Sequence, residues 1–328
     1  MTMSKVLCCV PTRGRYFTTL PLVLNAIIQQ SKPVDKLVIF DDNDEPQDMR
    51  KEPIYQFFFS MLNDKQIEWE WIFAEKKGQH HIHQAANEKA VKEGYKFVWR
   101  CDDDAIPEPN TLQNLYSHIS DDIGAVGGAV LMPQVKFNTS ASTGLIEHIN
   151  DEPNIQWAPI KNAKQVEHLH CSFLYRAGVH DYNLGLSRVA HREETLFTYG
   201  LFCKGYKIWV VPGATTWHLK SPSGGIRSET NAQLYEHDER IFRNILEYRD
   251  KTIVVLNCGM GDHVVFSRVL PKVKNPWVFT CYPEIVAGEP IAKAEQLFGS
   301  LEQFNVYAWM DKNKWKASIQ TAFEWMYT

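Results

Sequence analysis

Short apolar runs alternate with polar, turn-rich segments along most of the chain. Runs rich in β-branched and aromatic residues predict buried strands, and longer segments with periodic apolar positions predict helices. The strands are predicted at residues 5–10, 36–40, 68–74, 97–99 and 123–130, and the helices at residues 20–30, 54–61, 80–92 and 110–119. This alternation predicts an α/β fold that begins with a βαβ unit.

Three carboxylates, Asp102, Asp103 and Asp104, follow the strand predicted at residues 97–99. Two prolines shortly downstream prevent a helix or central strand from continuing, so the triplet lies at the carboxyl end of that strand. In open α/β sheets this end faces the ligand crevice. Strand periodicity places Asp102 and Asp104 on one side, where they can share a hard cation such as Mg²⁺ or Mn²⁺. The alternative is a solvated acidic loop.

Composition narrows the class of protein. A chain of 328 residues with 44% hydrophobic content can bury two domain cores. The net charge of −4 gives no global basic field, so contact with nucleic acid would need a local patch. The seven cysteines are scattered and lack C-x-x-C spacing, which argues against a disulfide framework and a zinc site. No run is long enough to span a membrane, and we expect a cytoplasmic protein.

The first two strands end in a recognisable signature. One ends in Val10, Pro11 and Thr12, where the family has V-x-x-P-T, and the other ends in Asp41 and Asp42. These segments resemble the amino-terminal part of family 2 glycosyltransferases of the GT-A fold, a Rossmann-like mixed sheet that binds nucleotide-diphospho-sugars. The resemblance implies that Pro11, Thr12 and one of the two aspartates contact the nucleobase and ribose. A plain turn is the alternative for the aspartates.

Several neighbouring residues join this predicted donor site. The family usually has an aromatic residue and an asparagine after the threonine, where this chain has Arg13 and Gly14. We expect the donor nucleotide to be contacted also by basic, glycine and acidic residues at the strand ends, namely Arg13, Arg15, Lys77, Gly78 and Asp103. The triplet also matches the DXD motif of such enzymes, with Asp102 and Asp104 as metal ligands.

A histidine-rich segment begins the helix predicted at residues 80–92. His80, His81 and His83 lack the spacing of a zinc-protease motif, and only His80 and His83 can share a helix face. We therefore interpret the segment as a polar helix amino terminus.

A second block, residues 188–218, resembles the family pattern E-D-x-D-L…G-Y-x-I…P-x-A…H. Glu193 and Glu194 stand on the E-D pair, Leu196 replaces the second aspartate, and His218 ends the block. The resemblance makes Glu194 or Glu193 the catalytic base and His218 a third metal ligand. A positioned carboxylate can deprotonate an attacking hydroxyl. The alternatives are a solvated first turn of a helix for the glutamates and an ordinary hydrogen-bonded histidine.

After His218, a Gly224-Gly225 hinge is flanked by Lys220 and Arg227. A segment of this kind can fold over a donor diphosphate and exclude water, so we expect Lys220 and Arg227 to contact the phosphates. An ordinary linker is the alternative.

The strand and helix pattern restarts near residue 251. A helix at residues 235–249 closes a first domain, 1–250, and residues 251–328 form a βαβαβα module. Its N-C-G-M-G-D-H turn weakly resembles heptosyltransferase-type GT-B domains. We interpret this module as an accessory α/β domain for acceptor docking or self-association.

Three functions are compatible with these patterns. The first is an inverting glycosyltransferase that needs Mn²⁺ or Mg²⁺ and moves a sugar from a nucleotide-sugar donor to a saccharide hydroxyl. The second glycosylates hydroxymethylated bases of viral DNA, and the third is an inactive nucleotide-sugar-binding protein. We expect no cation near Asp102 and Asp104 that could replace the metal ion in neutralising a diphosphate.

Overall fold

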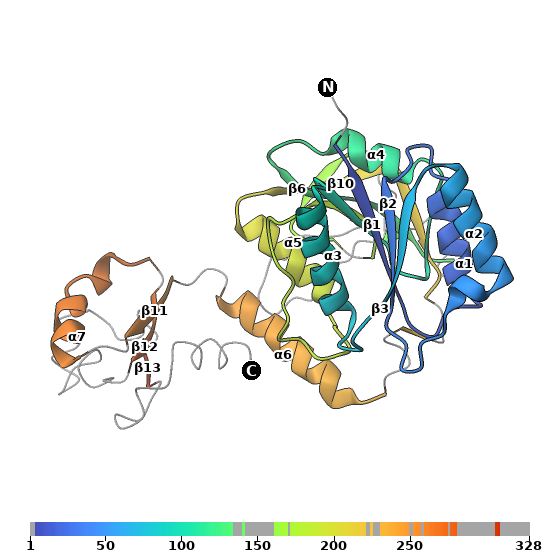
Figure 1. The fold of residues 1–328 in the computed structure, drawn as a ribbon. Coiled ribbons are helices and arrows are strands. Elements are labelled where there is room, and N and C mark those ends of the chain that lie inside the picture. Colours follow the sequence, from blue (N-terminus) through green and yellow to red (C-terminus); the bar gives the residue numbers. More distant parts are fainter. Residues whose placement is uncertain are drawn as a thin grey trace. The chain divides into compact units, whose positions relative to one another are not determined.

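The computed structural model describes most of the first 248 residues and parts of the remainder (Figure 1). The described residues are 4–133, 140–141, 161–169, 171–220, 224–225, 230–248, 252–256, 259–274, 276–280 and 306–308. The chain divides into two compact units, Met1–Asp238 and Glu239–Thr328.

The first unit is built on one large sheet with the order β3-β2-β1-β4-β9-β6-β10-β5. Four parallel strands form one half of it: β1 (Val6–Thr12), β2 (Lys36–Asp41), β3 (Glu68–Phe73) and β4 (Phe97–Arg100). Each contains a run that the sequence predicts as a strand. Parallel pairing brings the carboxyl ends of these strands to the same edge of the sheet.

The other half of the sheet is mixed. It contains β5 (Ala105–Pro107), β6 (Ile123–Leu131), β9 (Phe173–Arg176) and β10 (Lys207–His218), and β7 (Ser140–Ala141) and β8 (Lys164–Val166) pair with β6 and β10. Strand β9 is antiparallel to both β4 and β6, whereas β6 and β10 are parallel. The mixed α/β sheet confirms the predicted GT-A type of fold.

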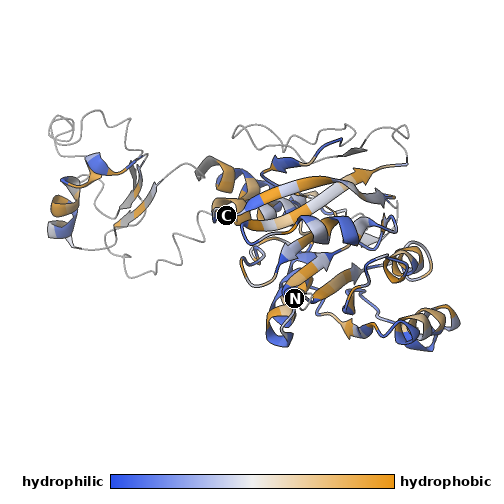
Figure 2. Cartoon of the chain, turned by 90° about the horizontal axis from the view of Figure 1, so that it is seen from above, coloured by the Kyte–Doolittle hydropathy of each residue, from blue (hydrophilic) through white to orange (hydrophobic). Residues whose placement is uncertain are grey.

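Helices cover both faces of the sheet (Figure 1). One apolar core joins the sheet to α1 (Leu20–Ile28), α2 (Pro53–Asp64) and α4 (Thr111–His118), and a second joins it to α3 (Gln79–Glu93) and α5 (Glu193–Cys203). Alternate residues of β1 enter the two cores, as strand geometry requires. In Figure 2 the helices show both hydrophobic and hydrophilic colours, in keeping with one buried face each.

One feature of this unit differs from the sequence predictions. His80 and His83 at the start of α3 are fully buried, so the interpretation as a polar helix amino terminus is wrong. Burial lowers the pKa of His80 to about 4, and the ring of His83 stacks on Tyr182. The strand β5 lies at the edge of the sheet and ends at Pro107, in agreement with the prediction that neither a helix nor a central strand continues through the prolines.

The second unit contains a parallel sheet with the order β11-β12-β13, formed by Thr252–Leu256, Pro276–Thr280 and Val306–Ala308. Helix α7 (Met260–Ser267) follows the first of these strands, and α6 (Ala232–Tyr248) precedes it. The three predicted strands of the module are therefore present. The remaining helices that a βαβαβα module requires fall on residues 281–305 and 309–328, which lie outside the described residues. Short 3₁₀ turns occur at Met49–Lys51 and Leu270–Lys272. Among the described residues, no helix has the length and apolar character that a membrane span needs.

Candidate active site

Polar groups meet at the carboxyl ends of β1, β2 and β4. The β1 and β2 ends are in register, with Thr12 opposite Asp41, and Cys9 of β1 lies opposite Arg100 at the end of β4. The acidic triplet begins two residues after Arg100. The three strand ends predicted to carry chemistry therefore lie side by side.

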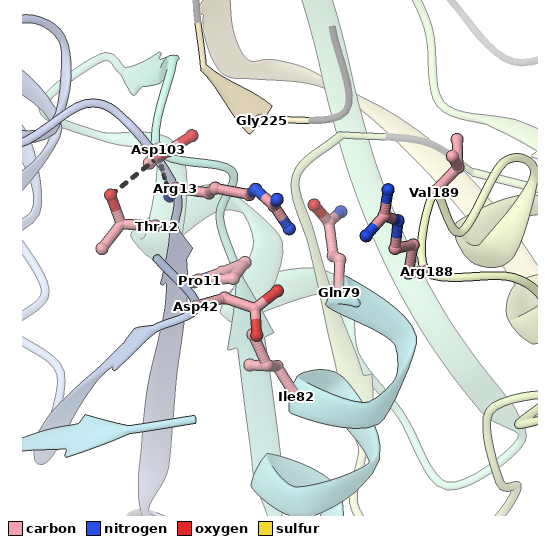
Figure 3. A pocket seen from close by; sticks show the side chains of 10 residues that line it. All are labelled: Pro11, Thr12, Arg13, Asp42, Gln79, Ile82, Asp103, Arg188, Val189 and Gly225. Atoms are coloured by element: carbon pink, nitrogen blue, oxygen red, sulfur yellow. Dashed lines mark hydrogen bonds between the residues drawn. The ribbon is translucent and has the colours of Figure 1, made fainter. Parts of the chain in front are cut away.

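Asp103 connects the β4 end to the loop after β1. It is buried, and its Oδ2 accepts hydrogen bonds from the Thr12 hydroxyl at 2.9 Å and from the Arg13 amide at 3.2 Å (Figure 3). Its Oδ1 is bound by the Arg15 guanidinium. Burial raises the pKa of Asp103 to about 6, although Arg15 opposes that shift. These bonds fix the position of the loop relative to the triplet.

Two arginines lie against the predicted metal ligands, so the expectation that no cation lies near them is wrong. Arg15 is only 4% exposed, and its Nη2 lies 3.2 Å from Asp104 Oδ2. Arg100 Nη2 donates to Asp102 Oδ1 at 2.8 Å. No sequence pattern predicts the contact between Arg15 and Asp104, because the two residues are far apart in the chain and only the loop after β1 brings Arg15 to the triplet.

Arg100 also links the triplet to α5. Its side chain is fully buried, lies 5.3 Å from the centre of the Phe173 ring, and donates to Glu193 Oε1 at 2.6 Å. Gln79 donates to the same Glu193 oxygen at 2.8 Å and to Asp102 at 3.3 Å. Burial disfavours the charge of Arg100, but Glu193 and Asp102 raise its pKa well above the usual value. Two donors thus hold Asp102 and Glu193 in a fixed relation.

His218, the last residue of β10, lies next to the triplet. It pairs in register with Ala105 of β5, and its Nε2 is 3.4 Å from Asp104 Oδ1. Potential ligand atoms of Asp102, Cys171 and His218 all lie within 4.8 Å of one another. The structure thus brings the predicted ligands Asp102 and His218 together and adds Cys171, which the sequence did not predict.

Cys171 reaches this place through β9. Arg100 of β4 pairs with Phe173 of β9 in antiparallel register, so Asp102 and Cys171 lie two residues beyond that pair on their respective strands. No sequence signal marked Cys171, because β9 itself was not predicted.

An acidic pocket opens above these residues. It is lined by Arg15, Gln79, the three aspartates of the triplet, Ala190, His191, Arg192, Glu194, His218 and Gly225. Glu194 lines this pocket, whereas Glu193 does not and is only 1% exposed. Leu196, which replaces an acidic residue of the family pattern, is buried. The reading of Glu193 as part of a solvated helix turn is wrong, because that side chain forms the buried partner of Arg100.

The backbone before α5 is locally unusual. Ala190 and Arg192, which line the acidic pocket, have φ values of 54° and 68° in the left-handed region. Such conformations cost free energy for residues other than glycine and concentrate at functional sites. They place Glu194 at the start of α5 facing the pocket.

A second pocket, here called the arginine pocket, adjoins the acidic pocket. It is lined by Pro11, Thr12, Arg13, Asp42, Gln79, Ile82, Asp103, Arg188, Val189 and Gly225. Figure 3 shows the side chains of Arg13, Gln79 and Arg188 extending toward one another across it. Arg188 was not predicted as a site residue.

The two aspartates after β2 have different surroundings. Asp42 lines the arginine pocket (Figure 3), whereas Asp41 is bound by the Tyr16 hydroxyl and by the Asn43 side-chain amide at 2.8 Å. Asp41 therefore stabilises the loops, and Asp42 is the carboxylate that can meet a ligand.

Comparison with known families decides the assignment. The family model described as Glycosyl transferase family 2 matches residues 8–182, more than half of the chain. The protein belongs to this family. The matched region contains β1, β2 and β4 and thus the acidic triplet, and the predicted family 2 resemblance is confirmed. No curated protein sequence matches the chain.

Solved structures similar to this family 2 protein share its fold at low sequence identity. TarS 1-349 of S. aureus in complex with UDP-GlcNAc is 15% identical, with a TM-score of 0.50, and the match covers 75% of this chain and 69% of that one. GalNAc-T7 with UDP, GalNAc and Mn²⁺ is 13% identical, with a TM-score of 0.51 and coverage of 72% and 47%. The chain spans 65% of TarS 1-349 in another crystal structure. The likeness to the first two structures supports the GT-A fold.

In this family 2 chain, Lys77 and Gly78 lie beside the arginine pocket. Lys77 pairs with Glu75 at 2.5 Å and, with Gly78, lines a neighbouring pocket that also contains Asp42. Gly78 has a φ of 100°, and a Cβ there would lie 2.6 Å from the carbonyl oxygen of Arg188. Only glycine permits this approach, which positions the Arg188 backbone.

The segment after His218 contacts the loop after β1. The Gly225 amide donates to the Arg13 carbonyl at 2.8 Å, and Arg15 Nη2 donates to the Gly224 carbonyl at 3.4 Å. Lys220 is exposed and has a left-handed φ of 48°. Arg227 lies outside the described residues.

Proposed function

We propose that the protein is an inverting glycosyltransferase that moves a sugar from a nucleotide-sugar donor to a hydroxyl group of a saccharide acceptor. The observation that carries this proposal is the joining of the two pockets. The arginine pocket and the acidic pocket share Gln79, Asp103 and Gly225, so a donor in the first would present its sugar beside Glu194 in the second.

The arginine pocket suits the donor nucleotide. Asp42 can accept hydrogen bonds from a base or from ribose hydroxyls. Arg13 and Arg188 supply positive charge, which favours a diphosphate between them. Family membership and the UDP-containing structures of TarS and GalNAc-T7 support a nucleotide-sugar donor.

The residues at the triplet fit a divalent cation. Asp102 and His218 offer a carboxylate and an imidazole, and Nδ1 of His218 is buried without a hydrogen-bond partner in the described structure. Asp102 and His218 would hold the ion, with Asp104 against the same imidazole. When bound, the ion would stabilise the negative charge of the departing nucleoside diphosphate. The presence of Mn²⁺ in the GalNAc-T7 structure supports Mn²⁺ as the candidate.

Glu194 is proposed as the general base. Its carboxylate takes the proton of the acceptor hydroxyl while that oxygen forms a bond to the anomeric carbon. The bond between that carbon and the diphosphate oxygen breaks in the same step, and the diphosphate leaves with the bonding electrons. One displacement inverts the anomeric configuration. Arg100 and Gln79 fix Glu193 and thereby the start of α5, which orients Glu194.

Charge at the site favours a saccharide over DNA as acceptor. The acidic pocket carries four carboxylates, from Asp102, Asp103, Asp104 and Glu194, against the two guanidinium groups of Arg15 and Arg192. A neutral sugar hydroxyl enters such a site without the repulsion that a phosphate backbone would meet. A DNA acceptor would need a basic patch, for which the second unit offers five lysines: Lys272 and Lys274 are exposed, and Lys312, Lys314 and Lys316 lie outside the described residues.

The test is a panel of nucleotide sugars incubated with the full chain and Mn²⁺, Mg²⁺ or EDTA, with release of nucleoside diphosphate as the readout. We expect hydrolysis of a donor with Mn²⁺, none in EDTA, and none with Asp102→Ala. Binding of a donor by calorimetry without turnover of any donor or acceptor would instead identify an inactive nucleotide-sugar-binding protein.

A further inference from the structure

Cys171 places a thiol among the predicted metal ligands. Its side chain is 1% exposed, and its sulfur belongs to the group of ligand atoms, with Asp102 and His218, that lie within 4.8 Å of one another. The thiol packs on one side in a small apolar cluster with Ala105, Val130 and Met132, and its sulfur also lies beside a carboxylate and an imidazole that line the acidic pocket.

The backbone holds the three side chains at this point from three strands. Asp102 follows β4, Cys171 precedes β9, and His218 ends β10. Cys171 has a φ of 65°, in the left-handed region that residues other than glycine seldom adopt. A conformation of that kind persists where the surrounding structure fixes it, and it commonly marks a functional position.

The ligand set has a definite chemical preference. Thiolate, imidazole and carboxylate together are typical of zinc and similar borderline ions, whereas Mg²⁺ prefers oxygen ligands only. Ligand atoms around one zinc ion lie about 3–4 Å apart, so a rotation that shifts side-chain atoms by about 1 Å would bring the three into coordination. The buried Nδ1 of His218 has no hydrogen-bond partner in the described structure and is available to an ion.

We propose that Cys171 is a third protein ligand of the divalent-cation site, with Asp102 and His218, and that the site therefore binds Zn²⁺ and Co²⁺ more tightly than Mg²⁺. This inference rests on the metal site of the proposed function and adds its ion preference. On binding, the thiol releases its proton to solvent and coordinates as thiolate. The sequence pattern argued against zinc because the cysteines lack C-x-x-C spacing, but these ligands come together from segments far apart in the chain.

The test is a titration of the metal-free full chain with Co²⁺, followed by absorption spectroscopy. A bond between thiolate and Co²⁺ gives a charge-transfer band in the near ultraviolet, separate from the visible bands of bound Co²⁺. We expect this band in the wild type, its loss in Cys171→Ser, and its retention in Cys203→Ser, which changes an exposed cysteine. Zn²⁺ affinity, measured by competition with a chromogenic chelator, should fall at least about 10-fold in Cys171→Ser and stay unchanged in Cys203→Ser.

Visible Co²⁺ bands in the wild type without a charge-transfer band would overturn the proposal, as would a band that survives Cys171→Ser or a wild type that binds no Co²⁺. The wild-type spectrum tests the ligand without any variant, and Cys171→Ala serves if the serine variant does not fold. Donor turnover with Mn²⁺ is measured separately. Turnover without the charge-transfer band would reject Cys171 as a ligand and leave the glycosyltransferase function supported. The band without turnover would support Cys171 as a ligand and reject the glycosyltransferase function.

Discussion

Adjacent residues of the chain acquire different chemistry from their surroundings. Glu193 faces the interior, where Arg100 and Gln79 bind it and burial raises its pKa, whereas Glu194 lines the acidic pocket. The resemblance alone left either residue as the base. The geometry favours Glu194, because a base must be within reach of the proton that it takes.

Glu194→Gln should therefore separate binding from chemistry. The amide keeps the shape of the side chain but cannot accept the proton, so donor affinity should remain while transfer falls by at least about 10²-fold. Calorimetry measures the affinity and a coupled assay measures the turnover. Glu236→Gln, at an exposed position of α6, is the matched control and should be as active as wild type. Unchanged turnover in Glu194→Gln would assign the base elsewhere.

Buried His80 should make stability sensitive to acid. Burial lowers its pKa to about 4, below the value of about 6.5 in the unfolded chain, so the unfolded state binds the proton first as the pH falls. The neutral His80 ring contributes its full share of the free energy of unfolding above about pH 6.5. That share is lost as the pH falls from about 6.5 to about 4, and the loss reaches about 2 kcal/mol at pH 5. Denaturant unfolding measures the free energy of unfolding at pH 7 and at pH 5. The decrease between the two pH values should be about 2 kcal/mol smaller in His80→Gln than in the wild type. His118→Gln, at an exposed position, should behave as wild type.

At the scale of elements, helix α3 is bounded by two glycines with different surroundings. Gly78 precedes it, with a φ of 100° and the Arg188 backbone directly opposite, whereas Gly94 follows it, with a φ of 78° and nothing within 4 Å of the place a Cβ would occupy. Both positions favour glycine for conformational reasons, but only Gly78 is also required by packing.

Gly78→Ala should consequently cost more than Gly94→Ala. We expect about 1 kcal/mol of lost stability for Gly94→Ala and at least about 2–3 kcal/mol for Gly78→Ala, measured by denaturant unfolding. Gly78→Ala should also weaken donor binding, because it displaces the Arg188 segment from the arginine pocket. Equal losses in the two variants would show that close packing at Gly78 is unimportant.

At the scale of the whole molecule, the second unit remains assigned by prediction to acceptor docking or self-association. The donor and acidic residues all lie in the first unit. Deletion of residues 251–328 should therefore spare metal-dependent donor hydrolysis and impair transfer to the true acceptor. Full-rate transfer by a folded truncated protein to every acceptor tested would reject the docking role.

Salt dependence distinguishes the two acceptor classes in the intact protein. For DNA, the logarithm of affinity should fall linearly with the logarithm of salt concentration, with a slope near −0.9 for each phosphate neutralised. A saccharide held by hydrogen bonds and aromatic stacking should bind almost independently of salt. Fluorescence titration of each acceptor between low and physiological salt makes the comparison, and a steep slope would contradict the proposed saccharide acceptor.

The sequence by itself determined the parallel half of the sheet and the place of its strand ends. Local apolar runs predicted β1, β2, β3 and β4, because a buried strand consists of consecutive apolar residues that can be recognised without knowing the rest of the fold. The acidic triplet and the pair Asp41 and Asp42 were located at those ends, and the structure then showed that Asp42 is the one of the pair that lines the arginine pocket. The family signature is local as well, and it singled out Glu193, Glu194 and His218 as candidates although they lie far along the chain from the triplet.

Only the tertiary structure decided which of these groups share surroundings. Strands β5 and β9 are short, and their pairing partners are distant in sequence, so the placing of Cys171 beside Asp102 had no local signal. The contact between Arg15 and Asp104 likewise had no local signal. Nor did the sequence show that Glu193 is buried while Glu194 lines the acidic pocket. Contacts of this kind depend on how the loops and sheet close on one another, because burial and electrostatic partners are properties of the folded chain rather than of its local pattern.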